Sequence, residues 1–297
     1  IIIAGTAVML FLRQPSFGRL PRGERLERIK QSPHYQDGAF RNLQPTELIT
    51  SEKGRLRVMW DFLFNKPEGI YPENPVPAIK TDLQKLPADS DWMVWFGHSS
   101  YLLQLSGKRI LVDPVFCTAA PVSFINKPFK GTDLYKPEDM PGIDFLVITH
   151  DHWDHLDYQT VKRLKGRIGK VICPLGVGKE DITELDWQEN AIASDGFTVH
   201  CLPARHFSGR GLTSNQTLWA SFLMETPSGN IYIGGDGGYG KHFQKIGNNY
   251  PRIDLAILEN GQYSENWRHI HTMPQELGSI AKDLKAKRVI TVHHSKY

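Results

Sequence analysis

The sequence predicts an α/β protein built on mixed β-sheets, and three observations support that class. Ten short strand-like segments recur along the chain, and few helical patterns separate them. A run of histidines and aspartates directly follows one of these strands. The chain has 297 residues, of which 40% are apolar, so it can bury a substantial core in one large domain.

The predicted strands begin only after residue 90. Helix-like patterns are expected over Tyr158 to Leu164 and Pro274 to Lys285. Strands in this number, with few helices, favour mixed sheets. The expected strands are Trp92 to Phe96, Tyr101 to Leu105, Arg109 to Val112, Phe145 to Thr149, Lys170 to Cys173, Phe197 to Leu202, Leu218 to Met224, Asn230 to Gly234, Leu255 to Glu259 and Arg288 to Val292.

The N-terminal third has a different composition. Residues 1–12 are uncharged and almost wholly apolar, which is too short for a bilayer core of about 30 Å. We expect them to be part of a signal anchor or signal peptide, the alternative being a short apolar element packed on the domain. The basic residues from Arg13 to Lys30 suit an anionic membrane surface. Residues 13–90 are expected to form an extended arm on a catalytic domain of residues 91–297.

The histidine-rich run has the spacing of a metal-binding loop. Three histidines and two aspartates occupy the six positions from His150 to His155. Imidazole nitrogen and carboxylate oxygen are ligands that zinc accepts. Side chains alternate along an extended stretch, so His150 and His152 point to one side and can bind one ion. Where the chain turns, Asp154 and His155 can bind a second ion.

Further candidate ligands follow later strands. His206, Asp236 and His293 each sit at a predicted strand end. Taken singly, each is more typical of a surface or turn residue, but together with the first loop they complete a two-metal set. We expect His150, His152 and His206 on one ion, Asp154, His155 and His293 on the other, and Asp236 as the bridge. His294 is an alternative to His293.

Several local motifs resemble the metallo-β-lactamase superfamily from about Asp91 onwards. Within it, the chain is most similar to the N-acyl-phosphatidylethanolamine-hydrolysing phospholipase D group and its bacterial relatives. The resemblance implies an αββα sandwich of two mixed sheets between outer helices. The motifs are Trp95 to Ser99, Asp113 to Phe116, the sequence HDHWDHLD from His150 to Asp157, Pro174 to Gly176, Glu184 to Trp187, Gly235 to Tyr239, and His271 in HTMPQE.

The resemblance also implies a chemistry. Two divalent ions, zinc first and manganese or iron as alternatives, would supply a bridging hydroxide near neutral pH. Asp154 would orient that hydroxide, and Asp236 would set the distance between the ions. His271 is expected to face the substrate phosphate or to donate a proton, although a structural hydrogen-bonded histidine is the competing interpretation. His98 is expected to be structural, and Arg205, Arg210 and Trp219 are weaker candidates for the substrate cleft.

Three functions remain open from the sequence. The first is a phospholipase D-type phosphodiesterase that releases an N-acylethanolamine from an N-acyl phospholipid. The second is a lactonase or other carboxyl-bond hydrolase, and the third is a non-catalytic metal-binding membrane protein. The expected partners are a phospholipid or small-molecule substrate and a membrane surface, with self-association open. A net charge of +3 is too small to indicate nucleic acid.

Overall fold

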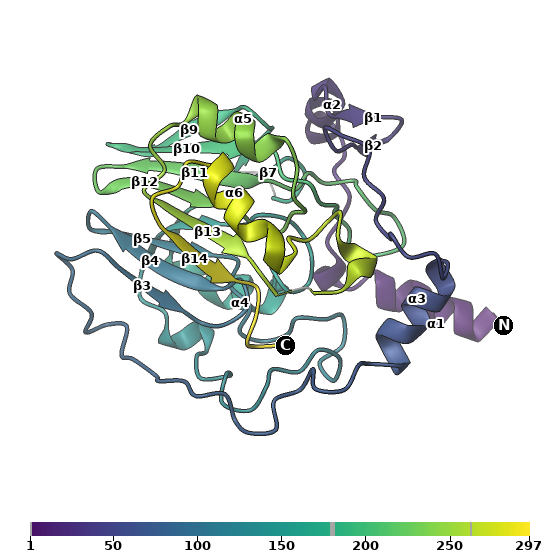
Figure 1. The fold of residues 1–297 in the computed structure, drawn as a ribbon. Helices are drawn as coiled ribbons and strands as arrows, with labels where there is room; N and C mark the ends of the chain where they lie inside the picture. The colour runs from purple at the N-terminus through teal and green to yellow at the C-terminus, as the bar shows by residue number, and fades with distance from the viewer. Residues whose placement is uncertain (1, 179–181, 262) are drawn as a thin grey trace.

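Two six-stranded sheets pack face to face in the computed structural model, which describes residues 2–178, 182–261 and 263–297 (Figure 1). The first sheet contains β3 (Trp92–Trp95), β4 (Tyr101–Leu105), β5 (Lys108–Val112), β6 (Ile143–Val147), β7 (Ile168–Pro174) and β8 (Thr183–Leu185). The second contains β9 (Asn190–Ser194), β10 (Phe197–Leu202), β11 (Ser221–Thr226), β12 (Gly229–Ile233), β13 (Leu255–Glu259) and β14 (Val289–Val292), and its order is β14-β13-β12-β11-β10-β9.

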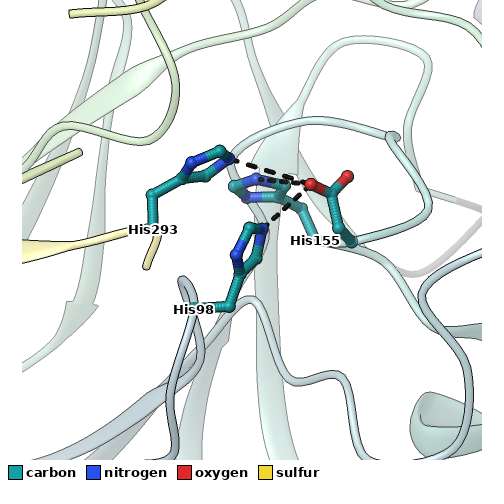
Figure 2. Close-up of side chains that lie close together, drawn as sticks. His98, His155 and His293 are labelled. Atoms are coloured by element: carbon teal, nitrogen blue, oxygen red, sulfur yellow. Dashed lines mark hydrogen bonds and ion pairs between the residues drawn. The ribbon is translucent and has the colours of Figure 1, made fainter. Parts of the chain in front are cut away.

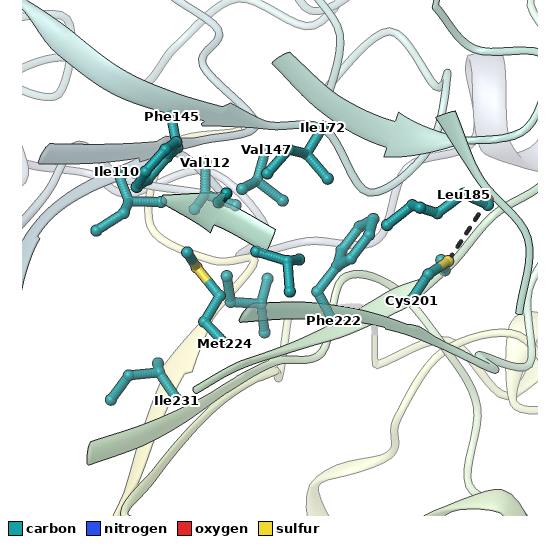
Figure 3. Packing of buried hydrophobic residues seen from close by; sticks show 14 of the residues in the cluster. Ile110, Val112, Phe145, Val147, Ile172, Leu185, Cys201, Phe222, Met224 and Ile231 are labelled. Carbon is teal, nitrogen blue, oxygen red and sulfur yellow. Dashed lines mark hydrogen bonds between the residues drawn. The ribbon is translucent and has the colours of Figure 1, made fainter. Parts of the chain in front are cut away.

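The core lies between the two sheets. Along β11, Phe222 and Met224 face it, whereas Leu223 faces the opposite side. The same alternation places Ile231 and Ile233 of β12 in the core and Tyr232 outside it, as the period of two in a strand requires. Strands β5, β6 and β7 supply the other half of the core (Figure 3).

Helices cover the outer face of each sheet. α4 (Tyr158–Leu164) packs on the first sheet through Leu164 and Val161. α5 (His242–Asn249) and α6 (Leu277–Asp283) pack on the second sheet, where Phe243 and Ile280 are buried. The predicted αββα sandwich of two mixed sheets is therefore confirmed.

Strand direction brings one set of loops together. β5, β6 and β7 are parallel to one another, and so are β12, β13 and β14. β10 is antiparallel to β11, which is antiparallel to β12, so β10 runs in the direction of β12. One edge of the sandwich consequently carries the carboxyl ends of six strands, namely β5, β6, β10, β12, β13 and β14. The loops that follow these strands all begin at that edge.

The segment before the sandwich holds short elements. They are α1 (Ile2–Leu12), α2 (Glu24–Gln31), the hairpin of β1 (Tyr35–Gln36) and β2 (Ala39–Phe40), and α3 (Arg55–Phe64). Short 3-10 turns complete the fold at η1 (Pro15–Phe17), η2 (Pro137–Asp139), η3 (Lys165–Arg167), η4 (Glu265–Trp267) and η5 (Pro274–Glu276). In the described ranges, every helix is too short or too polar to cross a membrane.

The N-terminal segment contributes to the main core. Phe40 of β2 and Ile29 of α2 are 0% and 1% exposed and belong to the cluster between the sheets. Arg25 Nη2 also donates to Glu184 Oε1 over 2.7 Å. The segment is thus bound to the sandwich by buried apolar contacts and by an ion pair.

Replacing Phe40 with alanine is expected to lower the free energy of unfolding by about 3 to 5 kcal/mol, because a fully buried aromatic ring leaves a cavity. Chemical denaturation monitored by circular dichroism measures this change. Leu43→Ala is the control, since Leu43 is 50% exposed and its loss should cost less than about 0.5 kcal/mol. Equal effects of the two changes would show that the segment is not part of the core.

Candidate metal centre

The histidine-rich loop lies between β6 and α4, and its two ends are fixed by hydrogen bonds. At its start, the Thr149 backbone N–H donates to Asp113 Oδ1 over 2.8 Å. At its end, Asp157 is the N-cap of α4, and its side chain accepts from the Gln159 N–H over 3.0 Å. These two anchors hold the short intervening run in one conformation.

Three imidazole nitrogens converge in a first group. His150 Nε2 lies 2.9 Å and His206 Nε2 lies 3.1 Å from His152 Nδ1. His206 Nδ1 is 2.7 Å from the carbonyl oxygen of Ile270, so Nδ1 carries the proton and Nε2 presents a lone pair. One proton on His152 cannot satisfy both neighbouring lone pairs at once. A cation placed between the three nitrogens would satisfy all of them.

A second group surrounds one carboxylate oxygen. Asp154 Oδ2 lies 2.9 Å from His98 Nε2, 3.8 Å from His293 Nε2 and 4.0 Å from His155 Nε2. Figure 2 shows the three imidazoles of His98, His155 and His293 converging on this point. The Asp154 side chain retains 27% exposure, whereas His155 is fully buried, so solvent reaches the second group from the side of Asp154.

Asp236 lies between the two groups. Its Oδ1 is 3.2 Å from His155 Nε2, and its Oδ2 is 3.0 Å from His293 Nε2 and 3.9 Å from His206 Nε2. One carboxylate therefore reaches ligand atoms of both groups. This is the position that a bridging ligand requires.

Buried carboxylates orient the rings from behind. Asp113 Oδ2 accepts from the Nδ1–H of His155 over 2.8 Å, which directs Nε2 into the centre. Glu259 accepts from His271 Nδ1 over 2.8 Å and from the backbone N–H groups of Gly237 and Thr272. Because these donors occupy its lone pairs, Glu259 is a poorer metal ligand than Asp236.

The backbone adopts unusual conformations around the centre. His98, Asp113 and His293 have φ values of 52°, 40° and 69°, a region that costs energy for residues other than glycine. At Gly238 a Cβ would lie 2.2 Å from the carbonyl oxygen of His269, so only glycine lets these two loops pass. Local backbone strain thus accompanies the convergence of these side chains.

Burial and charge divide the histidines into two classes. Burial, reinforced by the neighbouring imidazoles, holds the pKa values of His150 and His206 well below their usual range. Burial also disfavours charge on His293, but the nearby Asp236 carboxylate outweighs it and raises the pKa to about 9. The first group is therefore in the neutral form that binds metal, whereas a metal at His293 must displace a proton.

The donor set fits two divalent ions. Several buried polar atoms lack a hydrogen-bonding partner among the described residues, namely His152 Nε2, His155 Nε2, Asp236 Oδ1 and both ring nitrogens of His293. Four overlapping groups of side chains have ligand atoms within 4.8 Å of one another, and they include all seven predicted ligands. The structure thus brings together every residue of the predicted set, and metal binding by each stays a prediction.

Other sequence expectations fare differently. The His294 ring packs on Trp95, 4.7 Å away between centroids, and lies outside the four groups. His98, expected to be structural, is in the second group.

The three candidates for the substrate cleft have other surroundings. Trp219 is 1% exposed and belongs to the core, so it does not line a cleft. Arg205 donates to the carbonyl oxygen of Tyr239 over 3.0 Å. Arg210 stacks on Trp153 at 3.9 Å.

Two functional carboxylates were not identified as such from the sequence. Asp113 directly follows β5, and Glu259 is the last residue of β13. Both occupy the edge that carries the predicted ligands. An acidic residue at the carboxyl end of an apolar strand was the available signal, but nothing in the local sequence shows which imidazole each one meets.

An αββα sandwich with paired histidine and aspartate groups at the strand ends defines the chain as a metal-dependent hydrolase. Comparison with known protein families agrees, because residues 108–294 match the family described as beta-lactamase superfamily domain. The chain belongs to this family, and the predicted superfamily is confirmed. Divalent metal binding follows from that membership, without fixing which metal is bound.

Some proteins similar to this chain have an assigned activity and others do not. An uncharacterised protein of Mycobacterium tuberculosis is 39% identical over 262 residues, which cover 83% of this chain and 69% of that protein. The N-acyl-phosphatidylethanolamine-hydrolyzing phospholipase D 1 of Caenorhabditis elegans is 33% identical over 229 residues, covering 68% and 63%. A solved metallo hydrolase from Ignicoccus hospitalis has a TM-score of 0.51 at 22% identity, covering 68% and 81%.

Replacing Asp113 with asparagine is expected to lower metal affinity about 10- to 100-fold, because His155 loses the charged acceptor that directs its Nε2. Metal content after dialysis against a graded series of chelator concentrations measures the affinity. Glu138→Gln serves as the control, since Glu138 pairs with Arg163 at the exposed surface. Unchanged metal retention in the Asp113 variant would exclude this supporting role.

Proposed function

We propose that the chain is a phospholipase D-type phosphodiesterase that hydrolyses N-acyl phospholipids and releases an N-acylethanolamine. The observation that carries this proposal is the position of His271 beside both ligand groups. Its Nδ1 is 3.8 Å from Asp236 Oδ2, and its ring centroid is 5.0 Å from that of His206 and 5.3 Å from that of His293. The likeness to the Caenorhabditis elegans phospholipase D supports the same substrate class.

His271 has the geometry of a substrate-facing group. Glu259 accepts from its Nδ1, which leaves Nε2 free to contact the substrate. A protonated His271 would find its counter-charge in Glu259 and could donate from Nε2 to a phosphate oxygen or to the leaving alkoxide. The side chain retains 12% exposure, so it is accessible from outside the cluster.

The remaining residues have complementary roles in this proposal. When bound, the two divalent ions would supply an activated water near neutral pH and polarise the phosphoryl oxygen. Asp154, held by His98, orients the attacking oxygen. Asp236 keeps the two groups of ligands at a fixed separation. Attack at phosphorus breaks the bond to the ethanolamine oxygen, which leaves with a proton.

We also propose that the enzyme works at a membrane surface, to which the N-terminal residues anchor it. Val8, Met9 and Leu10 of α1 are 55%, 53% and 62% exposed, an arrangement unfavourable in water and suited to lipid. The basic residues after α1 support contact with anionic headgroups. The side of the membrane is left open.

A side-by-side assay tests the substrate. The metal-loaded protein is expected to cleave an N-acyl-phosphatidylethanolamine, and a chelator should abolish the cleavage because both ligand groups would lose their cations. Mass spectrometry of the released N-acylethanolamine measures the reaction. Asp236→Asn should abolish turnover while the protein stays soluble, since the bridging carboxylate is lost.

The same assay includes an acyl-homoserine lactone. Chelator-sensitive cleavage of the lactone alone would overturn the phosphodiesterase proposal and assign the enzyme to the carboxyl-bond hydrolases. Turnover retained after both metals are removed would contradict the two-metal chemistry itself.

His271→Ala is expected to reduce phosphodiester turnover by about 10² or more, as for loss of a general acid, and to reduce turnover of a lactone less. The ratio of the two kcat/KM values measures the difference. His269→Ala is a matched control two residues away, because His269 lies outside the four groups of described ligand atoms. Equal losses on both substrates would refute a contact between His271 and phosphate.

A further inference from the structure

Helix α3 carries several large apolar side chains that are exposed on one face. Leu56, Met59, Trp60 and Phe64 are 88%, 40%, 56% and 65% exposed. Their spacing of three and four residues places them on one face of the helix. The Trp60 and Phe64 rings lie 4.6 Å apart between centroids, so the face is continuous rather than a set of isolated side chains.

The opposite face of α3 holds the helix on the protein. Val58 is 1% exposed, and the Phe62 ring, although 52% exposed, lies 6.2 Å from that of Trp267 in an edge-to-face contact. Just before the helix, the Thr50 N–H donates to the carbonyl oxygen of Asn266 over 3.0 Å. Val58 thus anchors α3 on the protein, while the large apolar side chains on its other side remain in contact with solvent.

The charges around this face are mostly positive. From Lys53 to Lys66 the chain has four basic residues and one acidic residue, Asp61, and the acidic residues Glu52 and Glu68 lie just outside these bounds. Asp61 Oδ1 pairs with Arg57 Nε over 3.1 Å. Cations that flank an exposed face rich in tryptophan and phenylalanine are typical of a helix lying in the headgroup region of an anionic bilayer. In a pairing of two copies through α3, the same cations would repel one another.

The inward side of α3 is connected to the candidate centre by a short chain of contacts. Trp267, which Phe62 contacts, belongs to η4 (Glu265–Trp267), and its carbonyl oxygen accepts from the His271 N–H over 3.1 Å. The turn that supports α3 therefore also presents His271. A surface on the outward face of α3 is thus separated by about one helix diameter, about 10 Å, from the turn that presents His271.

We propose that the outward face of α3 docks on the surface of an anionic phospholipid bilayer and brings the His271 loop to about one helix diameter from the lipid headgroups. This inference rests on the proposed work at a membrane surface, to which it adds a second contact besides α1. It does not depend on which ester the metal centre hydrolyses.

Vesicle flotation with the full chain tests the docking. The probes are vesicles of phosphatidylcholine alone and of phosphatidylcholine mixed with phosphatidylglycerol. The double variant Trp60→Ser/Phe64→Ser should lower the partition coefficient on the mixed vesicles by about a hundredfold. Each large side chain that is no longer buried in lipid should lower that coefficient about tenfold. Binding of the unchanged protein should be stronger on the anionic vesicles and should weaken with added salt.

The matched control is Ile79→Ser/Ile192→Ser. These side chains are 88% and 73% exposed but lie outside α3, so their replacement should leave flotation unchanged. Tryptophan fluorescence gives an independent reading: the blue shift on vesicle addition should diminish in Trp60→Phe. Since α1 is intact in every variant, any difference between them reports on α3.

Three outcomes overturn the proposal. They are equal flotation of the α3 and control variants, failure of the unchanged protein to float, and a dimer in solution that only the α3 variant disrupts. Chelator-sensitive turnover of a soluble short-chain phosphodiester by all variants would show that the metal chemistry is intact. Failure of docking is thereby separated from failure of the proposed reaction.

Discussion

The hydrogen bonds behind the imidazole rings are the interaction on which the candidate centre depends. An imidazole can direct a lone pair forward only if the proton sits on its other nitrogen. The Ile270 carbonyl fixes that proton on His206, and the Asp113 carboxylate fixes it on His155. Thr149 Oγ1 plays the same part for His150, because it donates to Asp113 and can accept from His150 Nδ1, 3.0 Å away. Without these acceptors, the front-facing nitrogens would carry protons and repel a cation.

These acceptors also explain the arrangement of the fold. Asp113 follows β5 in the first sheet, whereas Ile270 precedes a helix that covers the second. The centre is completed only when the two sheets pack face to face, so the apolar core between them sets the positions of the ligands. The positive φ values of Asp113 and His293 are strained conformations that this packing maintains. Core and centre are therefore coupled through the strand ends.

The sequence predicts the parts of this arrangement that depend on local order. The strand, ligand run and helix around His150 are contiguous in the chain, and so they were identified from their spacing. The predicted strand from Phe145 to Thr149 ends two residues early in the structure, at Val147. The reason is tertiary: the Thr149 N–H donates to Asp113 Oδ1 instead of continuing a ladder. The helix expected from Pro274 begins as a 3-10 turn and ends at Asp283.

The features of the centre that the sequence could not predict depend on contacts between residues far apart in the chain. His98 is 56 positions from Asp154, and no local pattern relates them. The pairing of Glu259 with His271 likewise depends on how the loop after β13 folds back. The short strands β8 and β9 lie at sheet edges, where few neighbours reinforce a weak pattern. Local periodicity carries no information about such pairs, although it marks the edge at which they meet.

The N-terminal segment contacts both loops that carry the chemistry. Phe17, just after α1, packs edge-to-face on Trp153 of the histidine-rich loop at 4.9 Å, and Phe62 of α3 packs on Trp267 before His271. The sandwich supplies the candidate ligands, and these two aromatic contacts join the N-terminal segment to the loops that carry His152 and His271. Selection among substrates is therefore expected to depend on the segment before residue 90 more than on the sheets. A single metal-binding scaffold can in this way serve different esters, because the segment that contacts its loops is separate from the strands that carry the candidate ligands.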